Sequence, residues 1–78
     1  DLGYLWADRR KNLEQAKGMI QKALAAEPEN AAYLDSMGWV QYRLGNLDKG
    51  LEYLKRAYAQ RPDAEIAAHI GEVLWALG

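Results

Sequence analysis

Apolar and small residues recur at helical spacing in two central segments of the chain. The first segment places on one face the residues Leu34, Met37, Gly38, Gln41 and Leu44. The second does the same with Leu47, Leu51, Leu54, Ala57 and Tyr58. Because residues three and four positions apart share one face of an α-helix, the pattern predicts two amphipathic helices. Gly45 can supply the left-handed residue that ends the first helix, and Asn46 is a good N-cap for the second.

Similar breaks divide the rest of the chain. Pro28 is followed by a second N-cap candidate, Asn30, and the later proline by a third, Asp63. Asn12, with Gln15 three residues on, is a variant of the capping box. We therefore expect an all-α chain of five antiparallel helices, over residues 1–8, 13–26, 31–44, 47–60 and 64–77, with no strand.

The segments repeat with a period of about 34 residues. Pro28 and Pro62 are 34 residues apart, and Ala23 and Ala57 keep the same offset. The offset between equivalent residues is 35 at the start of the first and second units, and 33 at the start of the second and third. We therefore expect the first unit to hold one extra residue in a turn at residues 8–12. A fixed period of this length predicts a stack of helical repeats, in which alternate helices are equivalent.

The spacing of the small residues resembles that of the tetratricopeptide repeat (TPR). The middle unit fits the family pattern with Leu34, Met37, Gly38, Gly50, Leu54, Ala57 and Pro62. Two positions depart from it, since Gln41 stands where an aromatic residue is usual and Gly50 where alanine is usual. The resemblance implies a right-handed superhelical segment of about two and a half repeats, namely a partial repeat 1–28, a full repeat 29–62 and a half repeat 63–78. We expect the segment to be an excerpt of a longer array.

In this family the first, inner helices of the repeats line a concave groove that holds a partner peptide. The residues turned away from the expected core are the candidates for that groove: Tyr4, Asp8, Asp35, Ser36, Trp39, Tyr42, Arg43, His69 and Glu72. One row across the inner helices pairs Ser36 with His69. Trp and Tyr are favoured in binding hot spots, but Trp39 and Tyr42 could instead pack against the neighbouring repeat. Only Arg43 is basic, which argues against a groove that grips carboxylates.

Two functional hypotheses remain open. The first is an adaptor or scaffold that docks a protein or peptide; the second is a structural spacer or self-association segment with the ligand site in other repeats. The final helix is strongly apolar on one side through Ile66, Ile70, Val73, Leu74 and Leu77. Because each repeat buries its apolar side only against its neighbours, we expect the ends of the segment to self-associate.

Other functions find little support in the composition. The chain has no cysteine, which excludes thiol chemistry and disulfides. Its net charge of −1 does not favour nucleic acid, and no apolar run is long enough to span a bilayer. One histidine and scattered carboxylates make no metal set, so we expect no metal, no cofactor and no membrane contact. Ser36 and His69 would lie on adjacent helices with no oxyanion element, so we expect no enzyme.

The composition does not indicate in which cellular compartment the protein lies. More specifically, the amino-acid sequences of residues 34–40 and 67–75 look like those of TPR lipoproteins of the Gram-negative bacterial envelope. Some of these lipoproteins resemble adaptors that recruit a periplasmic protease. That resemblance implies a bacterial protein in the periplasm or attached to the outer membrane.

Overall fold

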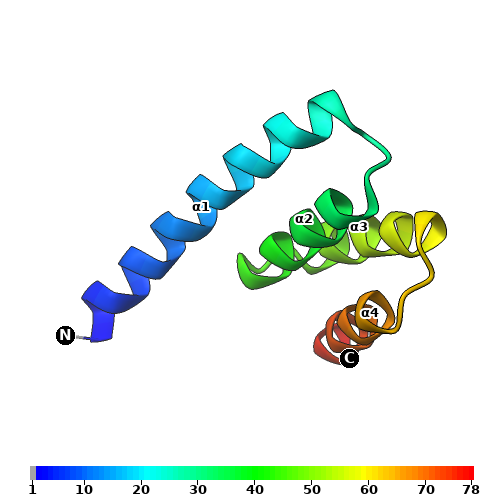
Figure 1. Ribbon diagram of the computed structural model, residues 1–78. Coiled ribbons are helices and arrows are strands. Elements are labelled where there is room, and N and C mark those ends of the chain that lie inside the picture. Colours follow the sequence, from blue (N-terminus) through cyan, green and yellow to red (C-terminus); the bar gives the residue numbers. More distant parts are fainter. Residues whose placement is uncertain (1) are drawn as a thin grey trace.

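The computed structural model describes the backbone of residues 2–78 and the side chains of residues 11–78. Within that range the chain forms four α-helices and no strand (Figure 1). The helices are α1 (Leu2–Ala26), α2 (Ala31–Arg43), α3 (Leu47–Gln60) and α4 (Ala64–Leu77). The expected all-helical fold is confirmed, and the expected number of five helices is wrong.

The difference lies in α1, which runs through residues 8–12 without a turn. The expected break there and the N-cap at Asn12 are therefore wrong, and the extra residue of the first unit is taken up inside a helix. The segment contains no glycine or proline, and Arg9, Arg10 and Lys11 are good helix formers. Nothing in the local sequence ends the helix, so the two expected helices continue as one, which Figure 1 shows reaching well beyond the other three.

The other expected breaks are present. Gly45 has a φ of 93°, the left-handed conformation that closes α2. Asn30 caps α2 by accepting a hydrogen bond from the Tyr33 backbone N–H at 3.1 Å. Asp63 caps α4 in the same way, since its side chain accepts a hydrogen bond from the Glu65 backbone N–H at 2.7 Å. These caps satisfy backbone donors that the first helical turn leaves without partners.

Asn46 precedes α3 as expected, but its side chain makes no capping hydrogen bond. It donates instead to the Gln41 side-chain oxygen at 2.8 Å, while its backbone N–H donates to the Gln41 carbonyl at 2.8 Å. Gln41, which replaces the usual aromatic residue, is 3% exposed. The turn between α2 and α3 is therefore held by two hydrogen bonds between these two residues, and the buried amide has the partner that burial requires.

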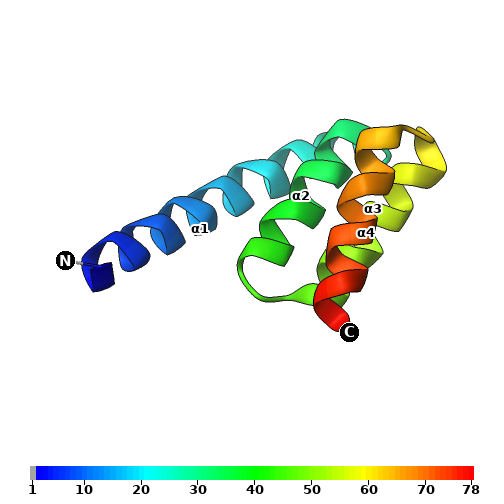
Figure 2. The same cartoon turned by 90° about the horizontal axis from the view of Figure 1, so that it is seen from below.

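Part of the buried core lies between α2, α3 and α4. Leu34 of α2, Ala57 of α3 and Ile66 of α4 are buried together there, with Leu24 of α1 and Tyr53 of α3 packed against them. Each helix packs on the next in the chain, and α2 also touches α4. Figure 2 shows α2 and α4 running alongside each other in the same direction, as expected for equivalent helices. Tyr58, which the pattern places on the same face as Leu54 and Ala57, is 42% exposed.

The closest helix crossing joins α2 and α3 at two glycines. A Cβ atom built on Gly38 would lie 2.6 Å from the Leu54 Cγ and 2.9 Å from the Gly50 carbonyl oxygen. One built on Gly50 would lie 2.9 Å from the Gly38 carbonyl oxygen. The small residue expected at Gly38 is therefore required for close packing, and Gly50, where alanine is usual, faces it directly. The crossing fixes how α2 is presented to the rest of the molecule.

Candidate functional site

An interaction between α2 and α4 forms the centre of the candidate site. His69 Nδ1 of α4 lies 2.9 Å from Asp35 Oδ1 of α2. Both side chains are partly buried, with 24% of the His69 side chain and 22% of the Asp35 side chain exposed. With the imidazole hydrogen on Nδ1, the ring donates to the carboxylate. The two equivalent helices of successive repeats are thus joined by a polar contact as well as by packing.

Aromatic rings extend this contact along α2. The Trp39 and His69 ring centroids are 4.4 Å apart with an angle of 31° between their planes. Trp39 also packs on Tyr42, with the two ring centroids 4.9 Å apart and an angle of 37° between the ring planes. Offset or tilted arrangements at these distances are favourable for aromatic pairs. We call the group of Asp35, Trp39, Tyr42 and His69 the α2–α4 cluster.

The structure thus brings together four of the nine residues proposed for the groove. All four are partly exposed, so the cluster is neither core nor a fully solvated surface. Trp39 and Tyr42 pack against each other, and Trp39 also packs against His69 of the next repeat. Trp39 therefore packs against the neighbouring repeat, Tyr42 packs on Trp39 of its own helix, and each ring retains exposed surface.

The remaining candidates fall into two groups. Ser36, Arg43 and Glu72 are exposed on α2 and α4. Tyr4 and Asp8 belong to α1, and their side chains lie outside the described residues. The candidate groove residues that the structure describes therefore come from α2 and α4 alone.

The pair of Asp35 and His69 was missed by the sequence argument. That argument aligned α2 with α4 at an offset of 33 residues, which places Ser36 opposite His69. Asp35 and His69 differ by 34 residues, the period set by the two prolines. A neighbour one position away along a helix is turned by about 100°, so a small rotation between α2 and α4 decides which residue meets the histidine. The 34-residue period is compatible with this pair, but it does not by itself select Asp35 over Ser36.

The cluster offers recognition chemistry more than reaction chemistry. It combines one carboxylate, one imidazole and two large aromatic rings on a partly exposed surface. Among the residues whose side chains are described, no three metal-ligating groups come together. No helix in the described part of the chain is long and apolar enough to cross a membrane. Aromatic side chains beside charged groups are typical of binding hot spots.

A second surface lies at the end of α4. Leu74, Trp75 and Leu77 are exposed large apolar residues, and Trp75 is 86% exposed. Gly71, Leu74, Trp75 and Gly78 line a shallow depression there. The expected apolar side of α4 is therefore divided, since Ile66 and Val73 are buried in the core. We call Leu74, Trp75 and Leu77 the α4 patch.

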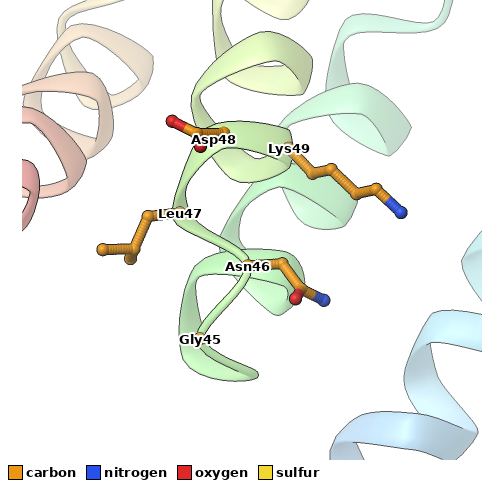
Figure 3. Close-up of a pocket in the computed structure, with 5 residues that line it drawn as sticks. All are labelled: Gly45, Asn46, Leu47, Asp48 and Lys49. Atoms are coloured by element: carbon orange, nitrogen blue, oxygen red, sulfur yellow. The ribbon is translucent and has the colours of Figure 1, made fainter.

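A third, smaller depression lies at the turn between α2 and α3, lined by residues 45–49. Figure 3 shows the side chains of Leu47 and Asp48 on one side of the turn and those of Asn46 and Lys49 on the other. Because these groups point in different directions, they present no common set of contacts to a ligand.

Comparison with known proteins identifies the repeat. The model of the tetratricopeptide-repeat family matches residues 5–65 and, again, residues 36–78. A TPR repeat-containing protein of Pseudomonas aeruginosa strain PAO1 is 49% identical over 71 residues, which cover 91% of this chain and 12% of that protein. The chain thus spans only a small part of the length of this curated relative. No solved structure matches the chain.

Proposed function

Because the chain belongs to the tetratricopeptide-repeat family, whose repeats generally mediate protein–protein interaction, we propose that it docks a partner protein or peptide on the α2–α4 cluster. The observation that carries the proposal is the contact of His69 with both Asp35 and Trp39, at 2.9 Å and at a centroid distance of 4.4 Å. These contacts hold a Trp ring at the surface in a fixed orientation. A preordered aromatic side chain loses little entropy on binding, which favours affinity.

The wider architecture of the proposal follows from the repeats. Residues 29–62 form one full repeat, preceded by a partial repeat at 1–28 and followed by a half repeat at 63–78. In this proposal the chain is a segment of a longer right-handed superhelical array, and α2 and α4 line its concave face. Extended concave surfaces are the binding surfaces that stacked repeats provide. The protein would act as an adaptor or scaffold and not as an enzyme.

The envelope assignment is a further part of the proposal. The matching relative is a bacterial protein. The amino-acid sequences of residues 34–40 and 67–75 are similar to those of TPR lipoproteins of the Gram-negative envelope. We propose that the protein lies in the bacterial periplasm or at the outer membrane, and that this segment contacts protein and neither lipid nor nucleic acid.

The second candidate function is that of a spacer or self-association segment. The α4 patch favours it, since three large apolar side chains lie exposed on one helix end. Exposed apolar patches on soluble proteins commonly mark interaction sites. In this case the ligand site of the protein would lie in other repeats.

Alanine substitutions separate the two functions. Trp39→Ala and Arg43→Ala would each be tested in the intact protein for partner affinity by calorimetry and for helicity by circular dichroism. The docking proposal expects a loss of affinity for Trp39→Ala of roughly 2 kcal/mol, the size of a binding hot spot, and a smaller loss for Arg43→Ala, with helicity unchanged. Unchanged affinity together with lost folding or lost self-association would instead favour the spacer function.

A further inference from the structure

Taking the proposed docking function as its basis, we infer that the α2–α4 cluster receives an arginine or lysine side chain of the partner. The observation that supports this is a carboxylate at the end of a row of aromatic rings from two helices. Asp35 contacts His69 Nδ1, the His69 ring packs on Trp39, and Trp39 packs on Tyr42. An acidic partner segment would instead meet the like charge of Asp35 here.

The aromatic rings supply the first half of the recognition. Trp39 and Tyr42 are partly exposed and lie next to each other on α2. The face of an aromatic ring carries partial negative charge, and a cation over a Trp face within about 6 Å of the centroid is attracted to it. The chain already contains such a contact elsewhere, with the Arg56 guanidinium 5.6 Å from the Tyr53 ring centroid.

The carboxylate supplies the second half. Asp35 Oδ1 is held by His69 Nδ1 at 2.9 Å, and 22% of the Asp35 side chain is exposed. A carboxylate has about four acceptor positions on two oxygens, so one hydrogen bond from the imidazole leaves capacity for a guanidinium or ammonium group. Hydrogen bonds between such ionised partners are shorter and stronger than those between neutral groups.

The surrounding charges favour the same partner. Helices α2 and α4 together carry three carboxylates, those of Asp35, Glu65 and Glu72, and one guanidinium, that of Arg43. Glu72 is exposed and lies three residues after His69, close to one helical turn. Arg43 lies eight residues after Asp35, roughly 12 Å further along α2. A cationic side chain near Asp35 and Trp39 therefore finds acidic neighbours, and Arg43 lies at the far end of the helix.

The experiment starts from peptides selected by phage display against the full chain. Selected peptides are kept if their binding is lost on Trp39→Ala, and each arginine is then replaced by citrulline, its neutral isostere. Affinities are measured for the unmodified chain, for Asp35→Asn and for Glu52→Gln. Asp35→Asn removes the charge while its amide oxygen can still accept the hydrogen bond from His69. Glu52→Gln is the matched control, because it removes one exposed carboxylate from α3, a helix that contributes no residue to the cluster.

We expect the peptides that depend on Trp39 to be enriched in arginine or lysine at one position. Citrulline at that position should weaken binding about tenfold. Asp35→Asn should weaken the arginine peptide to a similar extent, and Glu52→Gln should leave it nearly unchanged. The affinity of the citrulline peptide should not respond to Asp35→Asn. Added salt should weaken the arginine peptide more than the citrulline peptide.

The failures of the two proposals give different results. Trp39-dependent peptides without a basic residue, or with arginine that citrulline replaces at no cost, would overturn this inference and leave the docking proposal standing. Selected peptides that all bind the Trp39→Ala variant normally would overturn the docking proposal itself. Equal losses for Asp35→Asn and Glu52→Gln would also contradict the inference, because the effect would then belong to net charge and not to the cluster.

Discussion

His69 Nδ1 lies 2.9 Å from Asp35 Oδ1, and this contact ties α4 to α2 across one 34-residue repeat period. The same imidazole ring stacks on Trp39. One residue of the following repeat therefore positions two groups of the preceding one. The surface proposed to bind a partner exists only when the two repeats are packed together.

This arrangement predicts an energetic coupling between Asp35 and His69. A double-mutant cycle of Asp35→Ala and His69→Ala, measured by urea unfolding, should give a coupling of about 0.5–1.5 kcal/mol, the net value of a partly buried hydrogen bond. The matched control is the pair of Arg61 and Asp63. Arg61 Nε lies 3.6 Å from Asp63 Oδ2, and the arginine side chain is 70% exposed. That pair should couple weakly, as surface ion pairs do. Equal coupling in the two cycles would contradict the special role of His69.

The close crossing of α2 and α3 gives a second prediction. Gly38→Ala should lower the free energy of unfolding by about 1–3 kcal/mol, because the new methyl group would overlap Leu54 and the Gly50 carbonyl. Gly18→Ala in α1 is the matched control, since a Cβ atom there meets nothing within 4 Å. It should raise stability by about 0.5–1 kcal/mol through helix propensity. Chemical denaturation checks both, and a stabilising Gly38→Ala would show that the helices can separate at little cost.

The continuity of α1 gives a third prediction. Lys11→Pro should disrupt the helix, because proline removes a backbone donor and clashes with the preceding turn at a cost of about 3 kcal/mol. Circular dichroism should show a loss of helicity relative to Lys11→Ala. If a turn were present at residues 8–12, proline would be tolerated there, so unchanged helicity would restore the five-helix expectation.

The α4 patch gives a fourth prediction, on self-association. Leu74 is 49% exposed and Trp75 is 86% exposed, so covering them with another chain removes apolar area from water at about 25 cal/mol per Å². Sedimentation velocity over a concentration series should show assembly, which Leu74→Asp should abolish. Ala76→Asp, on the same exposed end of α4, controls for added charge. A monomer at every concentration would show that the patch does not drive association.

The sequence carried enough information for three of the four helices. Gly45, Asn30 and Asp63 act through local backbone chemistry, which a sequence displays directly. The failure in α1 came from the opposite inference, that a break had to recur because the period required it. No glycine or proline enforces a break at residues 8–12, and Arg9, Arg10 and Lys11 favour a helix.

The candidate site was predicted only as a surface. Periodicity places Asp35, Trp39 and His69 on exposed rows, and the structure brings them together. Which of Ser36 and Asp35 meets His69 depends on the rotation of α4 relative to α2, and α4 is packed in the core through buried residues such as Ile66 and Val73. A rotation of this kind is a tertiary quantity, and no local pattern reports it.

The central claim, that the partner docks on the α2–α4 cluster, is tested most directly by the indole N–H signals of the tryptophans in an NMR titration. Trp39 belongs to the cluster, and Trp75, on the α4 patch, serves as a control within the same molecule. We predict that partner binding shifts or broadens the Trp39 signal and leaves the Trp75 signal unchanged. A shift of Trp75 with Trp39 unmoved would contradict the claim and place the partner on the α4 patch.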